Sequence, residues 1–423
     1  MAMHYIDSIV RQQKSGTPVG ITSICSSHPM VLEAAVKFNK ARASHLLVES
    51  TSNQVNQFGG YTGMQPLDFM RFMHQLAHKH GLPLEHLTLG GDHLGPLVWH
   101  KEPPNQAMEK ALTMVRQYVQ AGYTKIHLDC SMPLGDDRDL PLALVAERTA
   151  LLAKAAEEAA EDPGTLRYIV GSEVPAAGGT KETEETMLIT SPAAAQETIQ
   201  AIKSAFIDCG LEAAWSRVRG LVVQPGVEFG EAQIHDYDRR QIRELSSMIT
   251  QESNLVFEAH STDYQTRSAL KALVEDQFAI LKVGPGLTFA LREGLLALAM
   301  IETQVMPQDN SQLLQVLEKS MLEKPGYWKE HYHGTPNEQR LSRLFSYSDR
   351  VRYYWSQPQV NTSVHQLMVN LEKIKIPLAL LSQYLPGQYC KVRSGELLAE
   401  PISLLWDKVI EVLEDYAFAV NPD

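Results

Sequence analysis

Residues 87–129 read LTLGGDHLGPLVWHKEPPNQAMEKALTMVRQYVQAGYTKIHLD, and this stretch contains the pattern that decides the fold. A short apolar run at 87–90 ends in Gly-Gly-Asp-His, and a second run at 125–129 ends in His-Leu-Asp. The segment 107–121 lies between them, and its apolar residues recur at helical spacing. These apolar residues are Met108, Ala111, Leu112, Val115 and Val119. The stretch therefore predicts a strand, a helix and a strand, with polar residues where each strand ends.

The same unit recurs from residue 17 to about residue 303. The predicted strands are Val19–Ile24, His45–Glu49, Leu87–Gly90, Lys125–Asp129, Tyr168–Glu173, Gly220–Gln224, Leu255–Glu258 and Ala279–Val283. The predicted helices lie near 30–42, 66–80, 107–121, 142–161, 193–209, 236–252, 266–276 and 288–303. Eight consecutive strand–helix units predict a (β/α)8 TIM barrel. An open doubly wound sheet is the alternative, but it usually has fewer strands and a glycine-rich phosphate fingerprint, and the sequence contains no G-x-G-x-x-G.

The sequence changes in character after residue 303. Residues 304–423 contain helical patterns that are interrupted by prolines and accompanied by many tyrosines and tryptophans. We therefore expect two parts: a barrel over 1–303 and an α-helical C-terminal extension over 304–423, packed on the barrel or on a partner.

Composition excludes several classes of protein. The 423 residues are 44% hydrophobic and 21% charged, as in a soluble globular protein. Lys+Arg 38 against Asp+Glu 50 gives a net charge of −12, which argues against nucleic acid or an anionic membrane as the main partner. No apolar run is long enough to span a bilayer, and the first residues lack the apolar core of a secretion signal. Four scattered cysteines without C-x-x-C spacing predict reduced thiols in a cytoplasmic protein.

Polar residues follow every predicted strand. The carboxyl ends of barrel strands open on one face, so these side chains are expected to gather there around a polar or charged small ligand or a metal. Packing alone does not account for them, because buried charge must be desolvated and paired. The residues after successive strands are Ser26 and Ser27; Glu49, Asn53, Gln54 and Gln57; Asp92 and His93; His127 and Asp129; Glu173; Gln224 and Glu228; Glu258, His260, Ser261, Thr262 and Asp263; and Lys282 with Gly284.

Each candidate also has a structural interpretation. His93 and His260 could bind a metal or substrate, or could hydrogen-bond a loop carbonyl. Asp92 could move protons or cap a turn. Lys282 lies in an apolar run, where a lysine could form a Schiff base with a carbonyl substrate or, as we favour, an ion pair with a strand-end carboxylate. Glu173 could contact a ligand or pair with a neighbouring base. Two histidines and several carboxylates suit Zn²⁺ or another divalent ion.

Several runs resemble one family over essentially the whole chain. The runs are VESTSNQVNQFGGYTGM (48–64), GGDHLGP (90–96), KIHLDCSM (125–132), GSEVP (171–175), VVQPGVEFG (222–230), FEAHSTDYQT (257–266), ILKVGP (280–285) and SDRVRYYW (348–355). They resemble the GatZ/KbaZ family, the Z subunits associated with D-tagatose-1,6-bisphosphate aldolase in galactitol and N-acetylgalactosamine catabolism. The resemblance does not distinguish these two branches.

The resemblance implies a partner. Z subunits are described as required for the full activity and stability of a shorter, zinc-dependent Y subunit, without aldolase activity of their own. It therefore implies a Y-type partner, an oligomer and a phosphorylated sugar as the ligand. Older descriptions call the family a tagatose-6-phosphate kinase, but the sequence has no G-x-x-x-x-G-K-[ST] loop, so no nucleotide is expected.

The chain also resembles a distant class II aldolase barrel. By that resemblance Asp92 handles the substrate proton, while Glu173 and Lys282 complete the catalytic candidates. Metal binding would fall to His93, His260 and Glu258. The candidate substrate-binding residues are Glu49, Asn53, Gln54, Gln57, Ser261 and Gly284.

The sequence departs from the class II pattern at the histidines. No histidine occurs in the segment 222–230, where the pattern expects one, and His260 is displaced within its motif. The preferred hypothesis is therefore a non-catalytic, chaperone-like subunit. The alternative is a metal-assisted aldolase or isomerase of sugar phosphates that is active in its own right.

Overall fold

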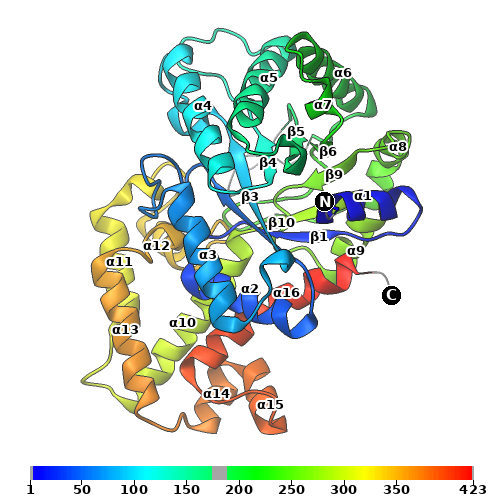
Figure 1. The fold of residues 1–423 in the computed structure, drawn as a ribbon. Coiled ribbons are helices and arrows are strands. Elements are labelled where there is room, and N and C mark those ends of the chain that lie inside the picture. Colours follow the sequence, from blue (N-terminus) through cyan, green and yellow to red (C-terminus); the bar gives the residue numbers. More distant parts are fainter. Residues whose placement is uncertain (1–2, 174–187, 422–423) are drawn as a thin grey trace.

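The computed structural model describes residues 3–173 and 188–421. Eight parallel strands close into a barrel in the order β1-β10-β9-β6-β5-β4-β3-β2, which confirms the predicted fold class (Figure 1). The barrel strands are β1 (Ile21–Ile24), β2 (Leu46–Thr51), β3 (Leu87–Leu94), β4 (Lys125–Leu128), β5 (Arg167–Val170), β6 (Val218–Val222), β9 (Val256–Ala259) and β10 (Phe278–Val283). A hairpin of β7 (Glu228–Phe229) and β8 (Ile234–His235) follows β6.

Helices cover the outside of the barrel, close to the predicted positions. They are α2 (Pro29–Arg42), α3 (Pro66–His80), α4 (Pro104–Gln120), α5 (Leu142–Ala159), α6 (Pro192–Asp208), α7 (Glu212–Trp215), α8 (Arg239–Thr250), α9 (Arg267–Glu275) and α10 (Pro285–Val305), with 3-10 turns η1 (Leu84–His86), η2 (Pro96–Trp99) and η3 (Pro163–Thr165). Their starts follow from local chemistry: five begin with proline, whose fixed φ suits the first turn. Ser191 and Thr266 cap α6 and α9 by accepting a backbone N–H.

The barrel interior is layered from one end to the other. Helix α1 (Tyr5–Lys14) covers the amino end of the strands, where Ile6, Ile9 and Val10 pack against Val19, Val256 and Ala279. The next layer is an apolar cluster formed by Ile21, Leu47, Ile169, Val222 and Ile280. Strand side chains point alternately inward and outward, so the inward residues two positions further along form the next layer. That layer is charged, and it supports the site.

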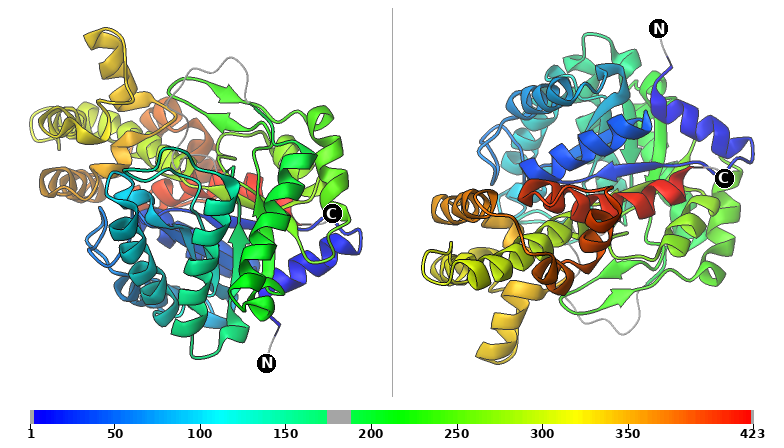
Figure 2. Two further views of the ribbon diagram at one scale, coloured as in Figure 1. Left: turned by 90° about the horizontal axis from the view of Figure 1, so that it is seen from above. Right: turned by 90° about the horizontal axis from the view of Figure 1, so that it is seen from below.

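Beyond α10, the regular elements of the described residues are all helices. The C-terminal extension contains α11 (Leu313–Glu323), η4 (Pro325–Tyr327), α12 (Pro336–Phe345), η5 (Arg350–Tyr353), α13 (Pro358–Glu372), α14 (Leu378–Tyr384), α15 (Pro386–Ser394) and α16 (Pro401–Val420). Helices α11 to α13 lie beside the barrel, whereas α16 packs against α2, α9 and α10 in the helix layer of the barrel itself (Figure 2). The separate domains at 1–303 and 304–423 therefore stay a proposal.

Close packing and hydrogen bonds fix α16 in that layer. A Cβ on Gly294 of α10 would lie 2.8 Å from the Cδ2 of Leu405, so glycine lets the two helices approach closely. The Gly20 amide donates to the Val420 carbonyl at 2.8 Å, and the Tyr416 hydroxyl lies 2.9 Å from that of Thr262. The extension thus contributes to the barrel wall.

Within the described ranges, no helix combines the length and the apolar character needed to cross a bilayer.

Candidate functional site

A β-bulge in β3 places Asp92 and His93 at the barrel mouth. The pairing of β3 with β4 shifts register between Gly91 and Leu94, and His93 has a φ of +47°. Bulges redirect side chains and are common beside active sites. The two preceding glycines make room: a Cβ on Gly90 would lie 2.7 Å from the Glu49 Cγ, and one on Gly91 would lie 2.4 Å from the Leu94 Cδ1. The two glycines of the motif Gly-Gly-Asp-His are therefore required by local geometry.

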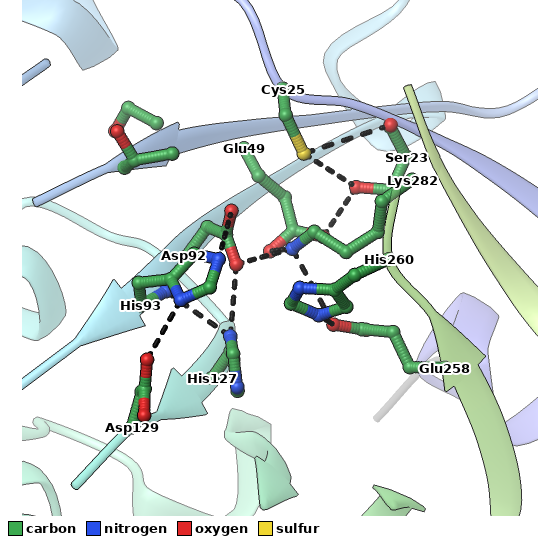
Figure 3. A network of polar contacts seen from close by, with 12 residues as sticks. Ser23, Cys25, Glu49, Asp92, His93, His127, Asp129, Glu258, His260 and Lys282 are labelled. Atoms are coloured by element: carbon green, nitrogen blue, oxygen red, sulfur yellow. Dashed lines mark hydrogen bonds and ion pairs between the residues drawn. The ribbon is translucent and has the colours of Figure 1, made fainter. Parts of the chain in front are cut away.

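Below the mouth, two lysines and two glutamates form a buried ion-pair layer, of which Figure 3 labels Lys282, Glu49 and Glu258. The Lys125 Nζ lies 2.6 Å from a Glu49 oxygen and 2.7 Å from a Glu258 oxygen. The Lys282 Nζ contacts Asp92 and lies 3.4 Å from both Glu49 and Glu258. Glu49 also accepts a hydrogen bond from the Ser23 hydroxyl. Each carboxylate thus has a cationic partner, as buried charge requires.

Three histidine rings meet above this layer. The ring centroids of His93, His127 and His260 lie 5.0 to 5.1 Å from one another. Each ring is held by a carboxylate: His93 Nδ1 lies 2.7 Å from Asp129, His127 Nδ1 lies 2.9 Å from Asp92, and His260 Nε2 lies 2.9 Å from Glu258. Such carboxylate partners fix the orientation of an imidazole. The three histidines come from β3, β4 and the end of β9.

The electrostatics assign a charge to each group. Burial works against ionisation of Asp92, but His93 and Lys282 outweigh it and hold the pKa of Asp92 well below its usual value. Burial likewise opposes the charge on Lys282, yet the surrounding carboxylates raise the pKa of its ammonium well above normal. Burial opposes the charge on His93, but Asp92 and Asp129 outweigh it and raise the pKa of His93. Burial and the nearby Lys282 lower the pKa of His260 to about 3. Lys282 is therefore held as a cation, which favours the predicted ion pair over the Schiff base.

A subset of these groups could hold a metal. One ligand atom each from Asp92, His127, Glu258 and His260 lies within 4.8 Å of the other three. The His127 Nε2 is buried without a hydrogen-bond partner in the described structure, so its lone pair is free to bind a metal in the tautomer that carries its proton on Nδ1. Two imidazoles and two carboxylates suit a borderline divalent ion. The group contains His260 and Glu258 as predicted, but His127 stands in place of His93.

A cavity of about 440 Å³ opens above the histidines. Eight of the predicted site residues line it: Asn53, Gln54, Asp92, His93, His260, Ser261, Lys282 and Gly284. The structure therefore brings these eight strand-end residues together around one cavity. Their individual catalytic, substrate-binding and metal-binding roles stay predictions.

Four predicted residues do not line the cavity. Glu49 and Glu258 lie beneath it in the fully buried ion-pair layer. Gln57 turns away and donates to the Lys110 carbonyl at 3.0 Å. Glu173 follows β5, but its side chain is exposed and accepts a hydrogen bond of 2.5 Å from Thr190. The prediction that Glu173 shares the cavity with the histidines thus differs from the structure, because the chain after β5 carries this carboxylate outward.

Sequence reasoning missed Lys125 as part of the site, and it named His127 and Asp129 as two residues at the end of one strand. In the structure His127 contacts Asp92, and Asp129 contacts His93. The signal was present in β4, where Lys125, His127 and Asp129 alternate along a strand whose inward face lines the barrel. Polar residues at every second position of a barrel strand indicate a charged interior.

Comparison with known proteins identifies the family of this chain. The model of the family described as D-tagatose-1,6-bisphosphate aldolase subunit GatZ/KbaZ-like matches residues 6–421. A protein of Sinorhizobium meliloti 1021, described as a probable tagatose 6 phosphate kinase, is 47% identical with a TM-score of 0.89, covering 95% of this chain and 100% of that one. The fructose-bisphosphate aldolase of Campylobacter jejuni is 11% identical with a TM-score of 0.47, covering 87% and 92%. The YdjI aldolase of Escherichia coli K12 is 12% identical with a TM-score of 0.42, covering 83% and 94%. The chain belongs to the GatZ/KbaZ-like family of D-tagatose-1,6-bisphosphate aldolase subunits.

Proposed function

We propose that this chain is a non-catalytic subunit of tagatose-1,6-bisphosphate aldolase, which binds a catalytic Y-type subunit and supports its activity and stability. The role would belong to the catabolism of tagatose 6-phosphate, galactitol or N-acetylgalactosamine. Family membership over residues 6–421 supports the link to the aldolase. The observation that carries the non-catalytic role is the contact of the Lys282 ammonium with Asp92, 3.4 Å from Glu258.

That contact bears directly on metal chemistry. A class II aldolase uses a divalent ion as a Lewis acid, and the ion needs a preorganised set of ligands. Asp92 and Glu258 are two of the four potential donors here, and both already act as counter-ions of lysines. A bound ion would share these carboxylates with Lys282 and Lys125, so we expect weaker binding than in a site whose carboxylates are free.

Support of a partner needs no chemistry in this chain. A protein that binds only the folded form of the Y subunit stabilises it by mass action, by about 2.7 kcal/mol when its free concentration is 100 times its dissociation constant. The partner then unfolds at a higher temperature and stays active for longer.

A mixing experiment tests the proposal. The purified chain, a Y subunit and their mixture are assayed for cleavage of tagatose 1,6-bisphosphate, and melting temperatures are measured in parallel. We expect negligible cleavage by the chain alone, together with a higher activity and melting temperature of the Y subunit in the mixture. Substantial cleavage by the chain alone would show that it is an enzyme.

A double variant separates support from catalysis. His93→Ala with His260→Ala removes two cavity histidines, and His74→Ala with His78→Ala, both exposed on α3, is the matched control. We expect both double variants to bind and support the Y subunit as wild type does. If the cavity variant still binds the Y subunit but no longer raises its activity, the cavity takes part in catalysis and the non-catalytic role is wrong.

A metal-assisted aldolase or isomerase of sugar phosphates is the second candidate. Among the described residues the His127 Nε2 has no hydrogen-bond partner, which favours this candidate, because buried polar atoms without partners are rare and His127 belongs to a set of possible ligands. A bound Zn²⁺ or other divalent ion would polarise a carbonyl of the substrate. Asp92, His127, Glu258 and His260 are the residues that would hold it.

Zinc titration tests this second candidate without an activity assay. If the group binds zinc, Zn²⁺ raises the melting temperature of the chelator-treated protein, and His127→Gln removes most of that rise. The exposed residue His74 provides the control variant His74→Gln. An equal response of wild type and His127→Gln would show that zinc binds elsewhere.

A further inference from the structure

The cavity has two walls of different origin. One wall consists of residues from the ends of the barrel strands, including Lys282 and the histidines. The other comes from the C-terminal extension, which contributes Arg352, Tyr353, Trp355, Ser356, Asn361 and Val364. The extension thus forms part of a binding site as well as packing on the barrel.

Arg352 is a cation of this cavity that none of the described carboxylates contacts directly. In residues 3–173 and 188–421, no carboxylate oxygen lies within 4.0 Å of its guanidinium nitrogens. Lys282, on the opposite wall, is neutralised by Asp92. The backbone amides at the start of α10 are also satisfied, because Gly284 and Gly286 donate to Asp263 at 2.9 and 2.7 Å. An anionic ligand therefore meets in Arg352 a cation that no described carboxylate contacts directly, while Asp349 and Asp263 act on its charge from a longer distance.

Hydrogen bonds within the C-terminal extension hold the guanidinium of Arg352 in place. Its Nη1 donates to the carbonyls of Ser348 and Asp349, and its Nη2 donates to the Tyr353 hydroxyl at 2.9 Å. The Asp349 side chain is fixed in turn by α10, since it lies 2.9 Å from Arg292. An arginine has five N–H donors, so these three bonds leave two for a ligand. Paired donors on a planar guanidinium match the oxygens of a phosphate.

A second arginine, Arg350, lies beside Tyr353. Arg350 also has no carboxylate partner within 4.0 Å among the described residues, and it donates to the Tyr327 carbonyl. Although burial opposes ionisation of Tyr353, Arg352 and Arg350 lower the pKa of its hydroxyl. The Tyr353 ring packs edge-on against Tyr61 at 4.9 Å and stacks on Tyr327 at 4.8 Å, so its position is set from both sides.

We propose that Arg352 and Tyr353 form a phosphate-binding end of the cavity, and that the ligand is a sugar phosphate whose sugar part extends toward Lys282 and the histidines. The choice of a sugar phosphate rests on the proposed function, because the family is named for a phosphorylated sugar. Arg352 would fix the phosphate by charge-assisted hydrogen bonds, and the Tyr353 hydroxyl would add a further donor.

Calorimetric titration of the full chain tests the proposal. The probes are D-tagatose 6-phosphate, unphosphorylated D-tagatose, inorganic phosphate and D-galacturonate, which carries a carboxylate in place of a phosphate. We expect tagatose 6-phosphate to bind most tightly and Arg352→Gln to weaken it about 10- to 100-fold. Arg352→Lys should restore part of the affinity, since it keeps the charge but loses the paired donors. The control is Arg393→Gln on α15, an exposed residue that contacts Tyr389.

Several results would overturn the proposal. These are equal binding of tagatose 6-phosphate by wild type and Arg352→Gln, equal binding of tagatose and its phosphate, or tighter Arg352-dependent binding of galacturonate. If Arg352→Gln does not fold, Tyr353→Phe decides, because it removes only the hydroxyl and keeps the ring. A loss of affinity for tagatose 6-phosphate in Tyr353→Phe supports the phosphate end, and unchanged affinity overturns it.

The mixing experiment with a Y subunit distinguishes a failure of this inference from a failure of the proposed function. A chain that binds tagatose 6-phosphate through Arg352 but fails to support a Y subunit would disprove the subunit role alone. A chain that supports the Y subunit, with Arg352→Gln binding the sugar phosphate like wild type, would disprove the phosphate end alone.

Discussion

At the scale of single residues, buried charge in this protein is organised by pairing. Lys125 and Lys282 lie among Glu49, Asp92 and Glu258, and each histidine ring is held by a carboxylate. Removing one member of such a network leaves a partner buried and uncompensated, which is costlier than the loss of one hydrogen bond. The network therefore fixes the orientation of the three histidine rings.

The buried carboxyl of Glu228 makes the stability of the folded protein depend on pH. Burial raises the pKa of this carboxyl to about 7 although the Phe229 amide donates to it. The folded state therefore binds the proton more tightly than the unfolded state. Stability relative to Glu228→Gln should fall as pH rises from about 4.5 to about 7, by on the order of 1.4 kcal/mol per unit.

Urea unfolding of wild type and Glu228→Gln between pH 4.5 and 8 measures this difference. The exposed residue Glu147 supplies the control variant Glu147→Gln, which should keep the pH dependence of wild type. A difference between wild type and Glu228→Gln that stays constant across this range would contradict the assignment.

At the scale of elements, the last helix, α16, forms part of the helix layer that covers the barrel. Helix α16 lies between α9 and α2 on the outside of the barrel, against α10. Its buried residues recur at helical spacing, and they include Leu404, Leu405, Val409, Leu413 and Tyr416. A segment more than a hundred residues beyond the last strand thus supplies part of the helix layer.

Truncation of one α16 side chain tests this packing. Leu405 is fully buried against Gly294, so Leu405→Ala should destabilise the protein by about 2–5 kcal/mol through lost burial and a residual cavity. Leu398→Ala is the matched control, because Leu398 is 64% exposed and should change stability little. Chemical unfolding of both variants provides the comparison, and equal effects would show that α16 does not contribute through this contact.

At the scale of the whole molecule, barrel and extension depend on each other. The extension supplies α16 to the helix layer, hydrogen bonds to Gly20 and Thr262, and one wall of the cavity. The large apolar core likewise continues from barrel residues into residues of α11, α13 and α16. The site is therefore a property of the complete chain.

This dependence predicts the behaviour of a fragment. A chain ending at residue 303 exposes the apolar faces that α16 covers, so we expect it to lack a cooperative thermal transition. Adding the separate fragment 304–423 should restore one at least in part. A sharp transition of the first fragment alone, measured by circular dichroism, would show that the barrel folds independently.

Local patterns in the sequence determined the barrel and most of its mouth. Alternating strand and helix periodicity placed eight units within a few residues of the structure, and polar strand ends indicated Asp92, His93, His260 and Lys282 as neighbours. This succeeds because residue spacing sets secondary structure locally, and a closed parallel barrel brings all carboxyl strand ends to one face.

Only the tertiary structure decided how these residues combine. The bulge at His93 and the register of β4 bring His127 beside Asp92 in the possible metal group, while Glu173 lies outside the cavity. Arg352 reaches the cavity from a segment far along the chain. Such contacts depend on strand register, barrel closure and the packing of distant helices, and the spacing of residues along the sequence does not encode these in any local pattern.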